Sequence, residues 1–144
     1  MEKEVLISIR GTQRSEGEEP QVIELTTDGK LYRDGESLCV SYVESEMTGL
    51  EGSVTTFLVK DSGIQLRREG QVNSTMTFVE GEKTESLYDL GFGAMLLGVS
   101  ARKVESNLSE NGGTLFVDYA VEVEHVPVGT NTYEIEVREA ASKV

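Results

Sequence analysis

Apolar and polar residues alternate along most of the chain. In the run at 115–124, Val117 and Tyr119 share one face, while Asp118 and Glu122 lie on the other. An alternation with a period of two is typical of a β-strand with one buried and one solvated face. Similar runs occur at residues 5–10, 38–42, 55–59, 64–67, 75–78 and 133–138. The pattern therefore predicts many short strands.

Turn-forming sequences separate these runs. Asp-Gly and Asn-Gly pairs accept the positive φ angles that tight hairpin turns require. Such pairs and related triplets occur at residues 28–29, 34–35, 61–63, 80–81, 111–113 and 127–129. We therefore predict an all-β fold, an antiparallel and mostly up-and-down barrel of roughly eight to ten strands. No repeat or linker divides the chain, so we expect a single domain over residues 1–144, with a flexible tail at 139–144.

One segment fits two kinds of secondary structure. Leu97, Ala101, Val104 and Leu108 recur at helical spacing, so residues 97–109 are compatible with an amphipathic helix. Gly98 and the β-branched residue after it disfavour a helix. We expect a long, bent strand here, with the helix as the alternative.

The charge of the chain narrows the range of partners. Its formal net charge is −13, which repels both nucleic acid and anionic membrane surfaces, and we expect it to bind neither. Cys39 is the single cysteine, so no intrachain disulfide is possible. The first residues lack the basic region and apolar core of a signal peptide. We therefore expect a cytoplasmic protein.

Several short segments form a recognisable set: the run at 44–52 with Thr55 and Thr56, residues 68–70 and 72–74, Ser86 to Asp89, Asn107-Leu108, Gly112-Gly113 and Asp118-Tyr119. Together they resemble the YwiB-like family of uncharacterised bacterial proteins. The resemblance spans nearly the whole chain. It implies a calycin-like β-barrel, the architecture of lipocalins and fatty-acid-binding proteins, and it favours a strand over a helix at 97–109. It implies no particular activity, because fold alone does not fix function.

The usual signs of catalysis are missing. His125 is the single histidine and Cys39 the single cysteine, which excludes a zinc site rich in these ligands. We read His125 as a surface residue and Cys39 as an inert strand residue without a neighbouring base. No nucleophile, P-loop, dinucleotide or calcium-loop motif is present. We therefore expect a protein that is not an enzyme and has no catalytic residues, metal or cofactor.

One group of polar residues lies on the same strand faces as the apolar residues that are predicted to point into the barrel. Tyr42, Glu44 and Glu46 continue the face of the strand at 38–42, and Arg68 continues the face of the strand at 64–67. Tyr119 also points inward. Buried charge is tolerable when it is paired, so we expect Glu44 or Glu46 to pair with Arg68.

This group has three interpretations. In the simplest, the charges lie at the barrel rim and Arg68 is a structural partner. In the second, Tyr42, Glu44, Glu46, Arg68 and Tyr119 form the polar end of a pocket for a small carboxylate-bearing or amphipathic ligand. Catalysis by the two glutamates ranks last, because carboxylates about 7 Å apart on one strand lie on the same side of any substrate.

Two functions remain open at this point. The first is a small non-enzymatic barrel that binds such a ligand in its interior. The alternative is an interaction module that uses a sheet edge or the turn from Met47 to Gly52 to bind a protein partner or a second copy of the chain.

Overall fold

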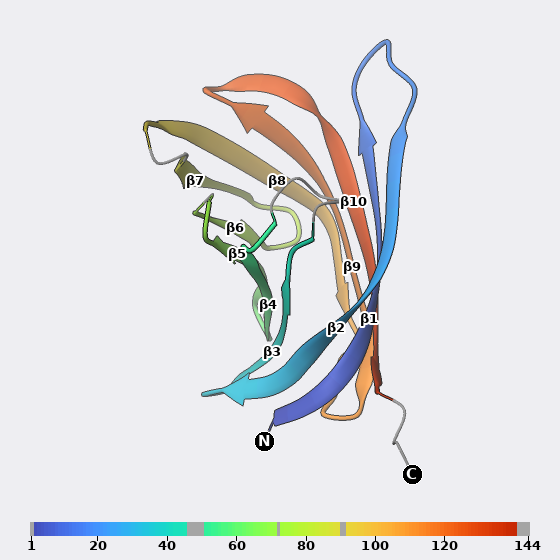
Figure 1. Cartoon of the computed structure of the whole chain (residues 1–144). Helices are drawn as coiled ribbons and strands as arrows, with labels where there is room; N and C mark the ends of the chain where they lie inside the picture. The colour runs from blue at the N-terminus through green and yellow to red at the C-terminus, as the bar shows by residue number, and fades with distance from the viewer. Residues whose placement is uncertain (1, 46–50, 72, 90–91, 141–144) are drawn as a thin grey trace.

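In the computed structural model the chain forms ten β-strands (Figure 1). The structure describes residues 2–45, 51–71, 73–89 and 92–140. The strands are β1 (Glu2–Arg14), β2 (Gln21–Asp34), β3 (Ser37–Val43), β4 (Val54–Lys60), β5 (Gly63–Glu69), β6 (Ser74–Phe78), β7 (Lys83–Asp89), β8 (Ala94–Ser106), β9 (Gly112–Val123) and β10 (Val126–Glu139). No helix occurs in these ranges.

The strands form one antiparallel sheet that curls into a nearly closed barrel. Its order is β6-β5-β4-β3-β2-β1-β10-β9-β8-β7, so each strand lies beside its neighbours in sequence and β1 pairs with β10. At the seam between β6 and β7, Asn73 and Asp89 exchange two backbone hydrogen bonds in an isolated bridge. The predicted all-β, antiparallel, up-and-down barrel is confirmed.

The inward faces predicted from the alternation form the core. Ile7, Val40, Phe57, Leu66 and Val117 are almost completely buried, and they meet in one apolar cluster inside the barrel. Cys39 is buried on the opposite face of β3, between Tyr32 and Leu58 of the neighbouring strands. Burial, together with Asp34, raises the pKa of the Cys39 thiol, which suits an unreactive cysteine.

The strand expected at 97–109 is present as β8, which begins earlier and ends at Ser106, and a β-bulge explains the helical spacing of its apolar residues. Ala101 pairs with Tyr119 and Lys103 pairs with Asp118, so Arg102 is an extra residue without a ladder partner. A bulge of this kind bends the strand and shifts the inward face by one position. Ala101 and Val104 therefore both face the core although they are three residues apart.

Unequal strand lengths position the candidate site. Only Lys30 to Asp34 of β2 pair with β3, while β1 follows β2 along nearly its whole length. A β-carbon at Gly29 would lie 2.6 Å from the carbonyl oxygen of Ser41 and would collide with Ile7, so glycine allows β2 to pass this close to β3. From Gly29 back toward the turn that joins β1 and β2, this hairpin extends past the shorter strands β3 to β6 (Figure 1).

β10 extends into the segment at 139–144 that was predicted to be a tail. Glu139 is the last residue of β10, and the N–H of Ala140 donates a hydrogen bond to the carbonyl oxygen of Glu4. The rest of the predicted tail, residues 141–144, lies outside the described residues.

Candidate functional site

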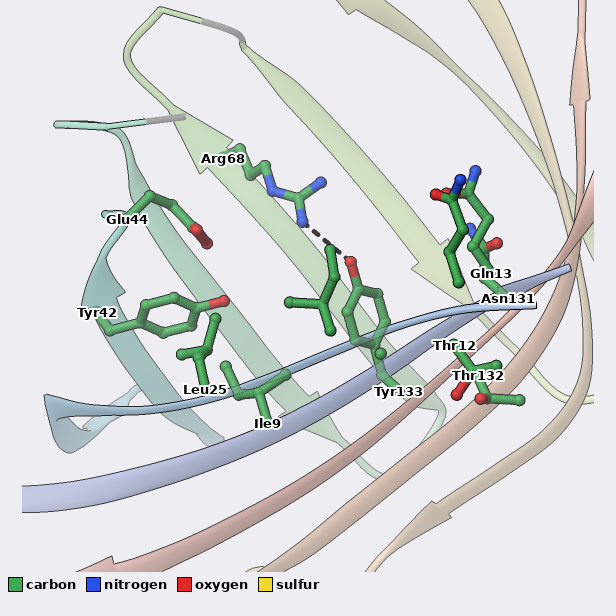
Figure 2. A pocket seen from close by; sticks show the side chains of 13 residues that line it. Ile9, Thr12, Gln13, Leu25, Tyr42, Glu44, Arg68, Asn131, Thr132 and Tyr133 are labelled. Carbon is green, nitrogen blue, oxygen red and sulfur yellow. Dashed lines mark hydrogen bonds between the residues drawn. The ribbon is translucent and has the colours of Figure 1, made fainter. Parts of the chain in front are cut away.

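A pocket of about 200 Å³ lies where the long and short strands diverge (Figure 2). β1, β2 and β10 form one side of the pocket, and the ends of β3 and β5 form the other. Its lining residues are Ile9, Gly11, Thr12, Gln13, Gln21, Ile23, Leu25, Tyr42, Glu44, Arg68, Asn131, Thr132 and Tyr133. Three of the five residues predicted for a polar site, Tyr42, Glu44 and Arg68, therefore share this pocket.

Arg68 is the cation of the pocket. It follows Ile64 and Leu66 on the inward face of β5, as the alternation predicted. One terminal nitrogen, Nη2, donates a hydrogen bond of 3.1 Å to the hydroxyl of Tyr133 (Figure 2). Its Nε is buried and has no hydrogen-bond partner among the described residues. A buried donor left in this state costs about 1–3 kcal/mol, or more for a charged group.

Glu44, directly after β3, is held in place by hydrogen bonds of its side chain and of its backbone. The residue is buried, and its Oε1 accepts a hydrogen bond of 3.0 Å from Oγ1 of Thr55, which has no exposed surface. The N–H of Glu44 donates to the carbonyl oxygen of Ser53 at 2.8 Å, and the N–H of Gly52 donates to the carbonyl oxygen of Glu44 at 3.1 Å. These bonds fix the position of the carboxylate.

Tyr42 supplies a neutral donor beside this carboxylate. Burial, and then the hydrogen-bonded carboxylate of Glu44, raise the pKa of the Tyr42 hydroxyl well above its ordinary value of 10.0. The phenol therefore keeps its proton at every physiological pH. Arg68 acts in the opposite direction on Tyr42 but does not outweigh these effects.

The direct pairing expected between Glu44 and Arg68 is not observed. Thr55 and Tyr42 bond the Glu44 side chain, whereas Tyr133 bonds Arg68, and no ion pair within 4.0 Å joins these two described residues. Burial alone would lower the pKa of Arg68, but Tyr133, Tyr42 and Glu44 outweigh it and raise that pKa, so the guanidinium stays charged. Glu46, the other expected partner, lies outside the described residues.

Tyr119 lies behind the pocket instead of lining it. Its ring is almost completely buried, stacks on the ring of Tyr133 at a centroid distance of 6.2 Å, and lies 4.7 Å from the ring of Phe78. Its hydroxyl accepts a hydrogen bond of 3.3 Å from Nδ2 of Asn131, which does line the pocket. Tyr119 therefore supports two lining residues from the core side.

Tyr133 and Asn131 line the pocket but were not among the site residues predicted from the sequence. The alternation on β10 places Tyr133 on the face of Ile135 and Val137, and continuing the same face two residues further back reaches Asn131. Polar residues at the end of an apolar face were therefore the available signal. Neighbouring strands contribute Gln13 and Gln21 in the same way.

The described residues include no group of three or more His, Cys, Asp or Glu side chains that could hold a metal ion. His125 is exposed in the β9–β10 turn, as predicted for a surface residue, and its Nδ1 lies 3.8 Å from Oε2 of Glu85. Within the part of the chain that the structure describes, no helix is long and apolar enough to cross a membrane.

Fold and pocket together define a small antiparallel β-barrel protein with a pocket that is lined by side chains of both charge signs on the side of β3 and β5. The chain belongs to the family described as domain of unknown function DUF1934, whose pattern matches residues 7–135. It is 27% identical over 137 residues to the uncharacterized β-barrel protein YwiB of Bacillus subtilis (strain 168), covering 92% of this chain and 94% of that protein.

A solved structure shows the same fold. The crystal structure of the ywiB protein from Bacillus subtilis matches with a TM-score of 0.77 and 23% identity, covering 97% of this chain and 94% of that one. The resemblance inferred from the sequence segments is thereby confirmed.

Proposed function

We propose that this barrel is a non-enzymatic, cytoplasmic binding protein that takes a small carboxylate-bearing or amphipathic molecule into the pocket. The observation that carries the proposal is the Nε of Arg68, a charged donor buried at the pocket without a partner among the described residues. A ligand carboxylate would satisfy this donor and gain a charge-assisted hydrogen bond. Tyr133 holds the guanidinium from the side and so pre-organises it.

The wall and size of the pocket narrow the ligand further. Ile9 and Leu25 provide an apolar wall on the side facing Tyr42 and Arg68 (Figure 2), and Ile23 also lines the pocket. Pockets for drug-sized ligands occupy roughly 300–1,000 Å³. With about 200 Å³, this pocket suits a molecule with one acidic group and a short apolar part.

A titration followed by NMR tests this proposal. The probes are 3-methylbutanoate and the alcohol of the same shape, 3-methylbutan-1-ol. We expect the carboxylate to bind at millimolar concentration and Arg68→Gln to weaken it at least about ten-fold, because a hydrogen bond to a charged group contributes about 1.5–3 kcal/mol.

Arg67→Gln is the matched control, because it removes the same charge one residue away, where Arg67 bonds Gln65. It should leave carboxylate binding unchanged. The proposal fails if the carboxylate does not bind, if the alcohol binds equally well, or if both arginine variants behave alike.

A protein-binding role has one observation in its favour. Residues 21–28 of β2 have no ladder partner on the β3 side within the described ranges, and Val22 and Ile23 there are 47% and 48% exposed. An open strand edge of this kind accepts an added strand. The turn from Met47 to Gly52 lies outside the described residues, except for Glu51 and Gly52. Light scattering that returned a dimer, lost on replacing Val22 by Lys, would favour this alternative.

A further inference from the structure

The β2 side of the pocket is also an open strand edge. Residues 21–28 of β2 pair with β1 on one side, whereas no described residue pairs with them on the β3 side, where the ladder begins at Lys30. Ile23 and Leu25, which alternate along this segment, line the same pocket as Arg68. The pocket therefore runs along an open edge whose backbone N–H and C=O groups are available to an added strand.

Tyr133 holds the guanidinium of Arg68 on the side of this open edge. In the ladder, Gly11 of β1 lies between Tyr133 of β10 and Ile23 of β2. A β-carbon at Gly11 would lie 3.3 Å from Cε1 of Tyr133, so the tyrosine ring lies over this glycine, on the way from β10 to β2. The hydroxyl of Tyr133 accepts the hydrogen bond from Nη2 of Arg68 (Figure 2). Arg68 and Ile23 therefore border one space.

We propose that the pocket binds the carboxyl end of an extended peptide chain, which adds as a strand to residues 21–28 of β2 and places its terminal carboxylate on Arg68. This proposal rests on the proposed function and names its carboxylate-bearing ligand as a chain terminus. The carboxylate would bond the buried Nε of Arg68, which lacks a partner among the described residues. Strand addition and capture of a chain terminus are both known modes of peptide recognition, and here they would act on one ligand.

The dimensions of the pocket fit the end of a chain. Its volume of about 200 Å³ is below the range of roughly 300–1,000 Å³ for drug-sized ligands, so it suits one terminal residue. Ile23 lines the pocket and is 48% exposed, which shows that the pocket opens to solvent along β2. At about 3.3 Å per residue, the open edge is about 26 Å long and accommodates several preceding residues of the ligand.

The charges of the open edge indicate the composition of the added strand. Glu24 and Asp28 are exposed on its outer face; Arg10 of β1 lies 3.7 Å from Glu24, whereas Asp28 forms no ion pair with a described residue. Opposite charges on neighbouring strands are stabilising and like charges are not. A strand with apolar inner residues and basic outer residues is therefore complementary. A second copy of the chain, with its net charge of −13 and the same acidic edge, is disfavoured.

An NMR titration compares two forms of one peptide. The probe is acetyl-Lys-Val-Thr-Val-Lys-Val with a free carboxyl end, and the control is its C-terminal amide. The net charge of the protein favours the more positive amide, so a preference for the acid must arise locally. We expect the acid to bind at least about ten-fold more tightly than the amide and at least about ten-fold more tightly than 3-methylbutanoate.

Two N-methylated isomers of the acid test the strand pairing. One isomer carries methyl groups on the nitrogens of the first two valines, and the other carries them on the nitrogens of the threonine and the second lysine. Successive N–H groups along a strand point to opposite sides, so only one of the two sets faces β2. We expect one isomer to bind at least about ten-fold more weakly than the parent acid and the other to stay within about three-fold of it.

Variants of the protein test the role of Arg68. Arg68→Gln should remove the preference for the acid over the amide, whereas Arg67→Gln, which removes the same charge where it bonds Gln65, should keep it. A preference that Arg68→Gln leaves intact would overturn the proposal.

Three further outcomes overturn it. They are acid and amide that bind the wild-type protein alike, N-methylated isomers that bind it alike, and a dimer in light scattering that Val22→Lys dissociates, because a second copy would then occupy the open edge. The two peptide comparisons do not depend on the folding of any variant. Arg68-dependent binding of 3-methylbutanoate as tight as that of the peptide acid would refute the chain terminus and leave the carboxylate site standing, whereas no binding of either carboxylate would refute both.

Discussion

Replacing Thr55 by valine tests the hydrogen bond that fixes Glu44 in place. Valine keeps the branched shape in a position with no exposed surface but removes the donor that lies 3.0 Å from Oε1 of Glu44. A hydrogen bond to a charged partner contributes about 1.5–3 kcal/mol, so we expect the free energy of unfolding to fall by about 2 kcal/mol. At about 2.1 cal/mol/K per residue, a chain of 144 residues has an unfolding entropy of about 0.3 kcal/mol/K, which makes the shift in Tm about 7 °C.

Urea denaturation of the wild type, Thr55→Val, Glu44→Gln and the double variant measures the contribution of this hydrogen bond. In the Glu44→Gln background the hydroxyl contacts a neutral amide, whose hydrogen bond contributes about 1 kcal/mol, so Thr55→Val should cost about 1 kcal/mol less there than in the wild type. Thr26→Val, at an exposed position of β2, is the control and should change stability by less than about 0.5 kcal/mol. Equal costs of Thr55→Val in both backgrounds would refute the idea that Thr55 supports the charge of Glu44.

Two further predictions concern the backbone near the pocket and the buried phenol. Gly29→Ala should lower the free energy of unfolding by about 1–3 kcal/mol in urea melts, because the new methyl group has no room. Gly93→Ala is the control, because its methyl group meets no atom within 4 Å and should change the free energy of unfolding little. Equal effects of the two substitutions would contradict this reasoning. Because the pKa of Tyr42 is raised, its contribution to stability is complete below pH 10 and decreases as the unfolded phenol ionises, by up to about 1.4 kcal/mol per pH unit. Urea melts from pH 8 to about pH 11 should therefore show a decline in the free energy of unfolding, and this decline should be smaller in Tyr42→Phe. An equal decline in the wild type and the variant would contradict a raised pKa of Tyr42.

The sequence was sufficient for the fold because one physical rule governs most of the chain. Residues of alternating polarity leave one face of each strand apolar, and hairpin turns bring those faces together, so positions such as Val40 and Leu66 could be assigned to the core in advance. The same rule led to Tyr42, Glu44 and Arg68, because each continues a buried face past its last apolar residue. These predictions required only local periodicity.

The remaining features depend on contacts between distant strands, which periodicity does not encode. Arg102 interrupts β8 as a bulge and produces a spacing that resembles a helix, although the residue itself carries no bulge signal. Tyr119 and Tyr133 both face inward, yet only the neighbouring strands determine that Tyr133 reaches the pocket while Tyr119 packs behind it. The ion pair expected between Glu44 and Arg68 is absent for a similar reason, since nearby hydroxyls bond these two residues separately.

The energetics of the pocket support the proposal that its charges serve binding more than folding. Replacing buried charged groups by well-packed apolar residues is often neutral or stabilising, and the main cluster of the barrel core consists of apolar side chains. Apolar residues at positions 44 and 68 would avoid the desolvation of two charges and the unsatisfied Nε of Arg68. Here, instead, Thr55, Tyr42 and Tyr133 hold those charges apart at one end of a pocket. In the proposed binding role, a ligand would supply the partner that the Nε of Arg68 lacks among the described residues.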